Sequence, residues 1–190
     1  MEIRETDERF GPMQNVKRRM FALRNGVIAD RLRRAGDPHR VIFGLNLPQL
    51  VEVAQATGAD AALARQLWAN ATTRESRLLA PMVMPREEMT AAEALEWAAT
   101  LQDAEEADIL CHRLLRHCPF ARALVDDLHA GQGWMRYAGL RLAFNLIYAA
   151  DATWRAHVLE LAAADLTSAD PAVARLASQL STEITYLTNS

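Results

Sequence analysis

The fold class is decided by a stretch near the middle of the chain that reads Thr90-Ala91-Ala92-Glu93-Ala94-Leu95-Glu96-Trp97. Thr90 and Glu93 have the spacing of a capping box, in which each side chain accepts a hydrogen bond from the other residue's backbone at a helix start. The alanines, leucine and glutamates that follow are strong helix formers. The stretch therefore predicts a helix that begins at Thr90 and ends near Gln102.

The same signals recur on both sides of this stretch, where alanine and leucine repeat at helical spacing. Asn46 and Asp60 are further N-cap candidates, and Gly58 and Pro85 are helix stops. Only Val41-Ile42-Phe43 resembles a strand. The predicted helices cover residues 15–34, 46–57, 60–70, 72–84, 90–102, 103–117, 119–129, 134–149, 153–166 and 171–187.

About ten helices with short connections predict an all-α protein in which neighbouring helices are antiparallel. Stacked antiparallel pairs form a HEAT-like α-solenoid, which is the fold class we expect, with a compact helical bundle as the alternative. The length of 190 residues fits one domain, so we expect a single unit over 1–190 with a loosely ordered N-terminal segment, 1–14.

The sequence indicates a cytoplasmic protein. Its beginning, MEIRETDERF, is too polar and acidic for a signal peptide. The most apolar stretch, from Tyr137 to Ala150, is interrupted by Arg141 and Asn145 and is shorter than the ~20 residues of a membrane helix. Cys111 and Cys118 lie seven residues apart on one predicted helix, which is about 10.5 Å and too far for a disulfide.

We expect neither a metal site nor a cofactor. Cys111, His112, His117 and Cys118 are spaced along one helix, so their side chains do not converge on one tetrahedral point. The chain also has no glycine-rich phosphate loop, zinc-protease pair or nucleophile elbow. ATP-driven chemistry and triad hydrolysis are therefore not expected.

Charge is unevenly distributed although the formal net charge is only −3. One segment carries Lys17, Arg18, Arg19, Arg24, Arg31, Arg33, Arg34 and Arg40 against Asp30 and Asp37. Such a run is either a phosphate-contacting patch or a solvated helix face. The segment from Glu87 to Asp108 has acidic residues and no basic one, which is typical of a solvated face.

Residues 41–141 resemble the DNA alkylation repair family, whose founding members are HEAT-like DNA glycosylases. The first matching segment runs from Ile42 to Leu50 and is similar to the family's aromatic-Gly-Val-x-x-Pro-x-Leu. The second is Leu67-Trp68 followed by Arg74-Glu75-Ser76-Arg77-Leu78-Leu79-Ala80, similar to Leu-Trp and His-Glu-x-Arg-x-Leu-Ala. Trp97 with Asp103 and Asp108, and then Trp134-Met135-Arg136, follow in the family's order.

The resemblance implies a DNA-binding face and excision of positively charged, N-alkylated purines. The family's catalytic carboxylate falls on Asp108, and its arginine falls on Arg136 or on Tyr137, depending on the register. Ala104 stands where the family has a tryptophan, and the late tryptophan of its aromatic cage has no counterpart. The DNA-binding residues that we expect are Lys17, Arg18, Arg24, Arg31, Arg77, Arg136 and Arg141.

Two main functions therefore stay open at this stage, and binding of RNA is a weaker third alternative that nothing in the sequence separates from binding of DNA. One is a protein that binds duplex DNA and excises alkylated purines with Asp108. The other is a non-catalytic helical scaffold that binds a protein partner, which the missing cage aromatics and the pI of 6.0 favour. Several single residues also have structural interpretations: Arg77 as a partner of a carboxylate between helices, Asp108 as a cap or ion-pair partner, and the tryptophans as core.

Overall fold

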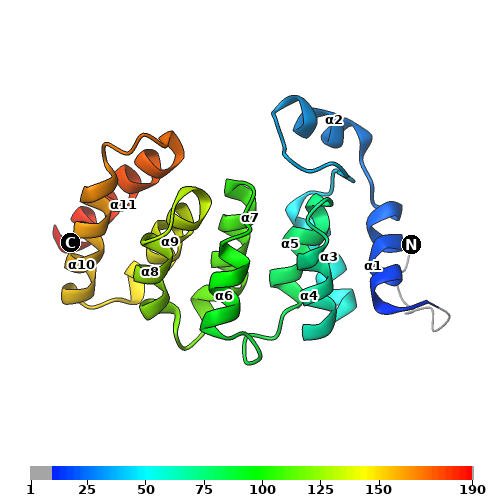
Figure 1. Cartoon of the computed structure of the whole chain (residues 1–190), viewed down its shortest axis with the longest axis horizontal. Coiled ribbons are helices and arrows are strands. Elements are labelled where there is room, and N and C mark those ends of the chain that lie inside the picture. The colour runs from blue at the N-terminus through cyan, green and yellow to red at the C-terminus, as the bar shows by residue number, and fades with distance from the viewer. Residues whose placement is uncertain (1–9, 190) are drawn as a thin grey trace. The chain divides into compact units, whose positions relative to one another are not determined.

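The computed structural model describes residues 10–189, and Figure 1 shows that this part of the chain is built from helices. It contains eleven α-helices, and within it extended pairing is limited to one isolated bridge, so the all-α prediction is confirmed. The chain divides into two compact units, Met1–Glu88 (unit 1) and Met89–Ser190 (unit 2). Within residues 10–189 no helix is both long enough and apolar enough to cross a membrane.

Unit 1 is assembled around its last helix. That helix, α5 (Arg74–Val83), is buried along almost its entire length and packs against α3 and α4. Helix α1 packs on α3 and α4 as well. The remaining helices of the unit are α1 (Pro12–Ala22), α2 (Gly26–Arg34), α3 (Leu47–Thr57) and α4 (Ala61–Ala69).

The first predicted helix, 15–34, is in fact two helices, α1 and α2. The break occurs because the Asn25 side chain accepts hydrogen bonds from the backbone N–H groups of Val27 and Ile28, which starts a new helix. The Asn25 N–H donates to the Phe43 carbonyl, 2.8 Å away, so a distant loop holds the break in place. Helix α1 already begins at Pro12, within the predicted loose segment 1–14, while residues 1–9 lie outside the described residues.

The strand-like Val41-Ile42-Phe43 contributes a single bridge rather than a strand. The Val41 N–H donates to the Thr72 carbonyl at 2.9 Å, and the Arg74 N–H donates to the Val41 carbonyl at 3.0 Å. These two bonds attach the connection between α2 and α3 to the start of α5. A loop that would otherwise move is thereby fixed beside the α1 helix.

Unit 2 is organised around α9 (Gly133–Leu146), which packs against α7, α8 and α11. Close contact with α8 depends on Gly139, because a Cβ there would lie 2.6 Å from the His129 nitrogen. Thr90 caps α6 as predicted, accepting a hydrogen bond from the Glu93 N–H at 3.1 Å. The helices around α9 are α6 (Ala91–Ala98), α7 (Ala104–Ile109), α8 (Ala121–His129), α10 (Ala152–Asp165) and α11 (Pro171–Asn189).

The predicted helix 103–117 changes its winding along its length. After α7 it widens into a π-helical segment, Leu110–Leu114, and then tightens into a 3₁₀ turn, Leu115–His117. Insertions of this kind occur frequently at functional sites. Cys111 and Cys118 are both buried and unbridged, in agreement with the spacing argument.

Candidate nucleic-acid interface

Basic side chains cover the first two helices and the loop after them. We call the exposed members of this segment the basic surface: Lys17, Arg18, Arg24, Arg31, Arg33, Arg34 and Arg40. The two acids of the same segment do little to offset this charge. Asp30 pairs with Arg33 at 2.9 Å, whereas the Asp37 side chain is 6% exposed and turns inward to His39 and Arg74.

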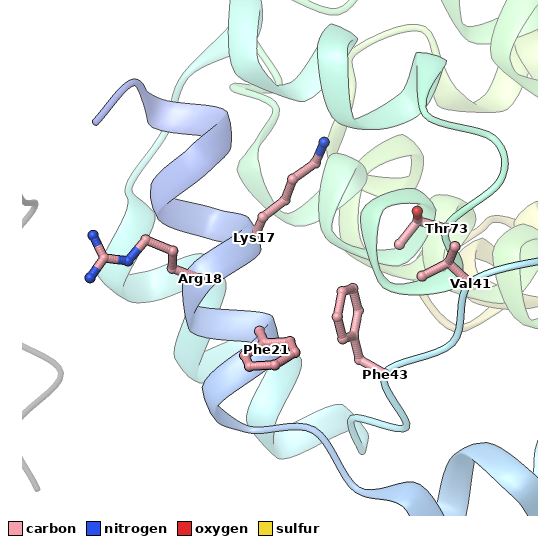
Figure 2. A pocket seen from close by; sticks show the side chains of 6 residues that line it. All are labelled: Lys17, Arg18, Phe21, Val41, Phe43 and Thr73. Carbon is pink, nitrogen blue, oxygen red and sulfur yellow. The ribbon is translucent and has the colours of Figure 1, made fainter. Parts of the chain in front are cut away.

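A hollow of about 510 Å³ opens within the basic surface, and Figure 2 shows the side chains that line it. Lys17 and Phe21 lie one helical turn apart on α1; the Phe21 ring lies on the side of Phe43, whereas the Lys17 side chain extends away from it. Arg18 leaves α1 on another side, where its guanidinium stacks 4.3 Å from the centre of the Phe10 ring. The lining residues of this first hollow are Lys17, Arg18, Phe21, Val41, Phe43 and Thr73.

A second hollow of about 460 Å³ shares Phe21 and Phe43 with the first. Arg24 and Arg33 belong to its lining, so basic residues border both hollows. The Arg24 guanidinium lies 3.8 Å from the centre of the Phe21 ring and donates a hydrogen bond to the Phe21 carbonyl. Cation–π stacking of this kind holds a phenyl ring at the surface in a defined orientation.

Glu75 holds the loop that carries Phe43. Its carboxylate is fully buried and accepts hydrogen bonds from the backbone N–H groups of Phe43, Gly44 and Leu45, at 3.0, 2.9 and 3.3 Å. The Arg74 guanidinium balances the charge, lying 3.0 Å from Glu75 and donating to the Leu45 carbonyl. A buried carboxylate is tolerated only with such compensation, so this network is part of the architecture of unit 1.

Gly44 allows the same loop to touch the start of α2. Its φ of +80° is a conformation that glycine adopts readily and other residues rarely do. A Cβ at this position would lie 2.2 Å from the Asn25 carbonyl oxygen and 2.8 Å from the Ala29 nitrogen. The position of the loop that carries Phe43 thus depends on its contact with Asn25 and Ala29, 19 and 15 residues before Gly44.

Arg77, one of the predicted DNA-binding residues, is not at the surface. It is 1% exposed, stacks 3.5 Å from the centre of the Trp68 ring and donates to the Trp68 carbonyl at 3.0 Å. The burial of Arg77 agrees with a structural role, and the partners described above are the indole and the carbonyl of Trp68, whereas the sequence interpretation named a carboxylate. We leave Arg77 out of the basic surface.

In unit 2, Asp108 lies in a small polar cluster between α7 and α9. Arg141 Nε is 2.6 Å from Asp108 Oδ1, and this contact is an ion pair rather than a hydrogen bond, because the buried Nε–H has no aligned acceptor. Tyr137 donates to Asp108 at 3.1 Å and receives a hydrogen bond from Arg141 at 2.9 Å. The Trp134 ring meets the Tyr137 ring edge-on, with 5.5 Å between centres.

Protonation in this cluster follows from burial and charge. Burial is the largest cause of the raised pKa of Tyr137, which keeps the phenol neutral and able to donate. For Arg141, burial acts to lower the pKa, but the hydrogen bond with Tyr137 and the charge of Asp108 outweigh it and raise the pKa. Burial also raises the pKa of Cys111, so this thiol is inert rather than nucleophilic.

Arg136 does not face Asp108. Its Nε donates to both carboxylate oxygens of Asp165, at 2.8 and 3.0 Å, and His129 lies 2.8 Å from the same carboxylate. The arginine that pairs with Asp108 is Arg141, five residues later and one turn after Tyr137 on α9. Arg141 is one of the residues expected at the DNA, whereas its pairing with Asp108 was not predicted.

Sequence reasoning also missed Phe21 and Phe43. Phe21 is 56% exposed, which is unusual for a phenylalanine at a helix end. Its position between Arg18 and Arg24 was the available signal, because aromatic residues interleaved with cations are typical of nucleic-acid-binding surfaces. Trp68 and Trp97 are core residues as predicted, and Trp134 and Trp154 are half-buried.

A family model described as DNA alkylation repair enzyme matches residues 16–174. A search of curated proteins finds no matching relative. Among solved structures, the chain resembles one described as "a new family of proteins related to the HEAT-like repeat DNA glycosylases with affinity for branched DNA structures". The TM-score is 0.80 at 15% identity, over 93% of this chain and 77% of that one. This likeness is one of fold, and it confirms the HEAT-like class.

Proposed function

Since the chain belongs to the DNA alkylation repair family, we propose that it binds duplex DNA through the basic surface. The observation that carries this proposal is the exposure of the cations of segment 17–40 together with the inward turn of Asp37. Lysine and arginine side chains that neutralise phosphates release condensed counterions, which supplies most of the affinity of sequence-independent DNA binding. The affinity for branched DNA of the structurally similar protein supports the choice of partner.

The first test is the salt dependence of duplex binding. Fluorescence anisotropy at several salt concentrations measures the slope of log K against log salt, which is about −0.9 for each phosphate contact. We expect a variant carrying Lys17→Gln, Arg18→Gln, Arg24→Gln and Arg31→Gln to bind more weakly and to show a shallower slope. Each substituted side chain that contacts a phosphate should reduce the slope by about 0.9.

The matched control is Arg175→Gln, which removes an exposed arginine from α11 in the other unit. It should leave the slope unchanged, and circular dichroism should show the same helix content for all variants. A slope that is equally steep in the fourfold variant and the wild type would contradict the proposal. Duplex binding that does not depend on salt would instead favour the scaffold function and a protein partner.

We infer a second, catalytic function at Asp108. The observation that favours it is a carboxylate 41% exposed, next to Tyr137, Arg141 and the half-buried Trp134. An N-alkylated purine is positively charged and leaves with its glycosidic electrons, so positive charge develops on the sugar. A carboxylate stabilises this charge, and aromatic faces stabilise the cationic base. In the free protein Arg141 neutralises Asp108, so we infer that a DNA phosphate must draw the guanidinium away before the carboxylate acts.

Release of 3-methyladenine and 7-methylguanine from methylated duplex DNA tests this second function. We expect release by the wild type, loss of release in Asp108→Asn, and normal release in Asp126→Asn. Asp126 is the matched control because it is an exposed aspartate of the same unit whose carboxylate lies 2.7 Å from the Nε2 atom of His157. No release by the wild type would overturn the catalytic function and leave the DNA-binding proposal standing.

A further inference from the structure

We propose that the first hollow, between Phe21 and Phe43, holds an unpaired base of a DNA strand. The inference rests on the proposed DNA binding and specifies the kind of DNA that the basic surface prefers. It predicts preference for DNA with a single-stranded segment, such as a fork or a junction, over a continuous duplex. Three features of the hollow support a base as its occupant: the aromatic lining, the cations around the hollow and the fixed position of its walls.

The lining of the first hollow has the chemistry of a base site. Phe21 and Phe43 come from different elements, α1 and the loop before α3, and Val41 and Thr73 complete the wall, as Figure 2 shows. A volume of about 510 Å³ falls within the range of small-molecule sites. Bases of any sequence stack on aromatic side chains, because every base has a π-face.

The exposure of Phe21 has a cost that packing within unit 1 does not explain. More than half of its side chain faces solvent, and Arg24, which lines the second hollow and not the first, stacks on its ring. The ring is therefore oriented by a cation on one side while it lines the first hollow on the other. An apolar surface that is exposed and rimmed by charge marks a binding site more often than a defect.

The charge around the hollow fits a nucleic-acid strand. Lys17 and Arg18 line the first hollow, and Arg24 and Arg33 line the second. A base placed between the phenyl rings carries a phosphate on each side along its strand, and these phosphates would meet cations in both directions. Such a combination of a positive groove and aromatic platforms is the general design of single-strand binding surfaces.

The walls of the hollow are already in place without a ligand. Glu75 holds the backbone of Phe43, and the bridge between Val41 and Thr73 holds the neighbouring part of the same wall. A preorganised site loses less conformational entropy on binding than a mobile one. A fixed space of this kind favours a small planar group, which can enter it unchanged. A peptide, in contrast, would have to reshape it.

The test compares a forked DNA with a duplex of the same length and charge. The fork carries 2-aminopurine, a fluorescent base that is quenched when stacked, at its first unpaired position. We expect the wild type to bind the fork more tightly than the duplex and to change the fluorescence of 2-aminopurine. In Phe21→Ala the ratio of fork affinity to duplex affinity should fall about tenfold, since base–aromatic stacking has this magnitude. The ratio is the readout because Arg24, which stacks on Phe21, also belongs to the basic surface.

Two control variants make the result specific. Tyr186→Ala removes an aromatic side chain of similar exposure, 67%, from α11 and should leave both affinities unchanged. Phe21→Trp keeps a stacking surface and should retain the fork preference.

If the ratio of fork affinity to duplex affinity is the same in the wild type and in Phe21→Ala, the inference is wrong. This conclusion holds whether the hollow binds a peptide or no ligand. Failure of the proposed function looks different, because duplex binding by the wild type would then be absent or insensitive to salt.

Discussion

Two of the arginine–carboxylate pairs among the described residues, Arg74–Glu75 and Arg141–Asp108, differ in their surroundings. In unit 1, Glu75 is fully buried and its charge is satisfied by three backbone N–H groups and by Arg74. In unit 2, Asp108 keeps 41% of its side chain exposed and shares its charge with Arg141 and Tyr137. The first pair holds a loop in position, whereas the second leaves a carboxylate accessible to a ligand.

This difference separates residues that maintain the fold from residues that are able to act on a substrate. The motif that carries the family resemblance, Arg74 to Ala80, lies on the most buried helix of unit 1. Its charged side chains face the core and the loop before α3, so they cannot reach a DNA molecule without unfolding. Recognisable motif residues are therefore not by themselves candidates for catalysis in this chain.

The largest effect that tests the comparison is expected for Glu75→Gln. The substitution removes the closer of the two ion pairs of buried Arg74, leaving the one to Asp37 at 3.6 Å, and weakens the acceptor for three N–H groups, which costs about 3 kcal/mol in the free energy of unfolding. Urea denaturation measures this loss. The control is Glu52→Gln on the exposed side of α3, which should change the free energy by less than about 0.5 kcal/mol. Equal stabilities of the two variants would contradict a structural role for Glu75.

The next largest effect is expected for Gly44→Ala. A φ of +80° is strained for alanine by about 1–3 kcal/mol, and the added Cβ would also clash with the Asn25 carbonyl. Gly58→Ala separates the two contributions, because Gly58 has the same φ and no atom within 4 Å of an added Cβ. Thermal unfolding should therefore show a greater loss for Gly44→Ala than for Gly58→Ala. An equal loss of stability in both variants would mean that a Cβ at position 44 does not clash with the start of α2.

A smaller effect on stability is expected for Asp108→Asn. Partly exposed ion pairs contribute about 1 kcal/mol or less, so the midpoint of denaturation should barely move. The side chain of asparagine also keeps an acceptor for the Tyr137 hydroxyl. A loss of stability comparable to that of Glu75→Gln would erase the distinction between the two pairs and make Asp108 a structural residue.

The smallest effect is a change in pH dependence at Tyr137. Its pKa is raised above the ordinary tyrosine value, with burial as the main cause, so the folded state holds its proton more tightly than the unfolded state does. Stability from this group is complete below the unfolded pKa of about 10 and falls as pH rises through the folded pKa. Tyr137→Phe should flatten the decline of stability above about pH 10, which urea denaturation at several pH values measures. An unchanged decline would contradict the burial effect.

Local signals placed most of the helices correctly, because caps and stops act over a few residues. Asn46, Asp60 and Thr90 each accept a hydrogen bond from the first turn of the helix that they were predicted to start. The break at Asn25 was missed although asparagine is a favoured cap, since the helical periodicity of 15–34 appeared continuous. The N–H of Asn25 is satisfied by Phe43, and that long-range contact is not visible in a local pattern.

The candidate site was predictable in part. Asp108 was singled out from the resemblance, and the structure places Arg141 and Tyr137 beside it, whereas Arg136 belongs to Asp165 and His129. Arg77 was expected at the DNA, yet it stacks on Trp68 in the core. The neighbouring helices were therefore needed to decide which residues of a helix belong to the candidate site and which belong to the core.

The sequence alone determined the all-α class, the family and the basic segment 17–40, because these depend on composition, short-range periodicity and motif order. Only the tertiary structure decided which charges are exposed and which are buried. It turned Asp37 and Arg77 inward, brought Phe43 next to Phe21, and paired Asp108 with Arg141. The physical reason is that burial and ion pairing are set here by contacts between different elements, whose residues lie 9 to 37 positions apart and which no local pattern encodes.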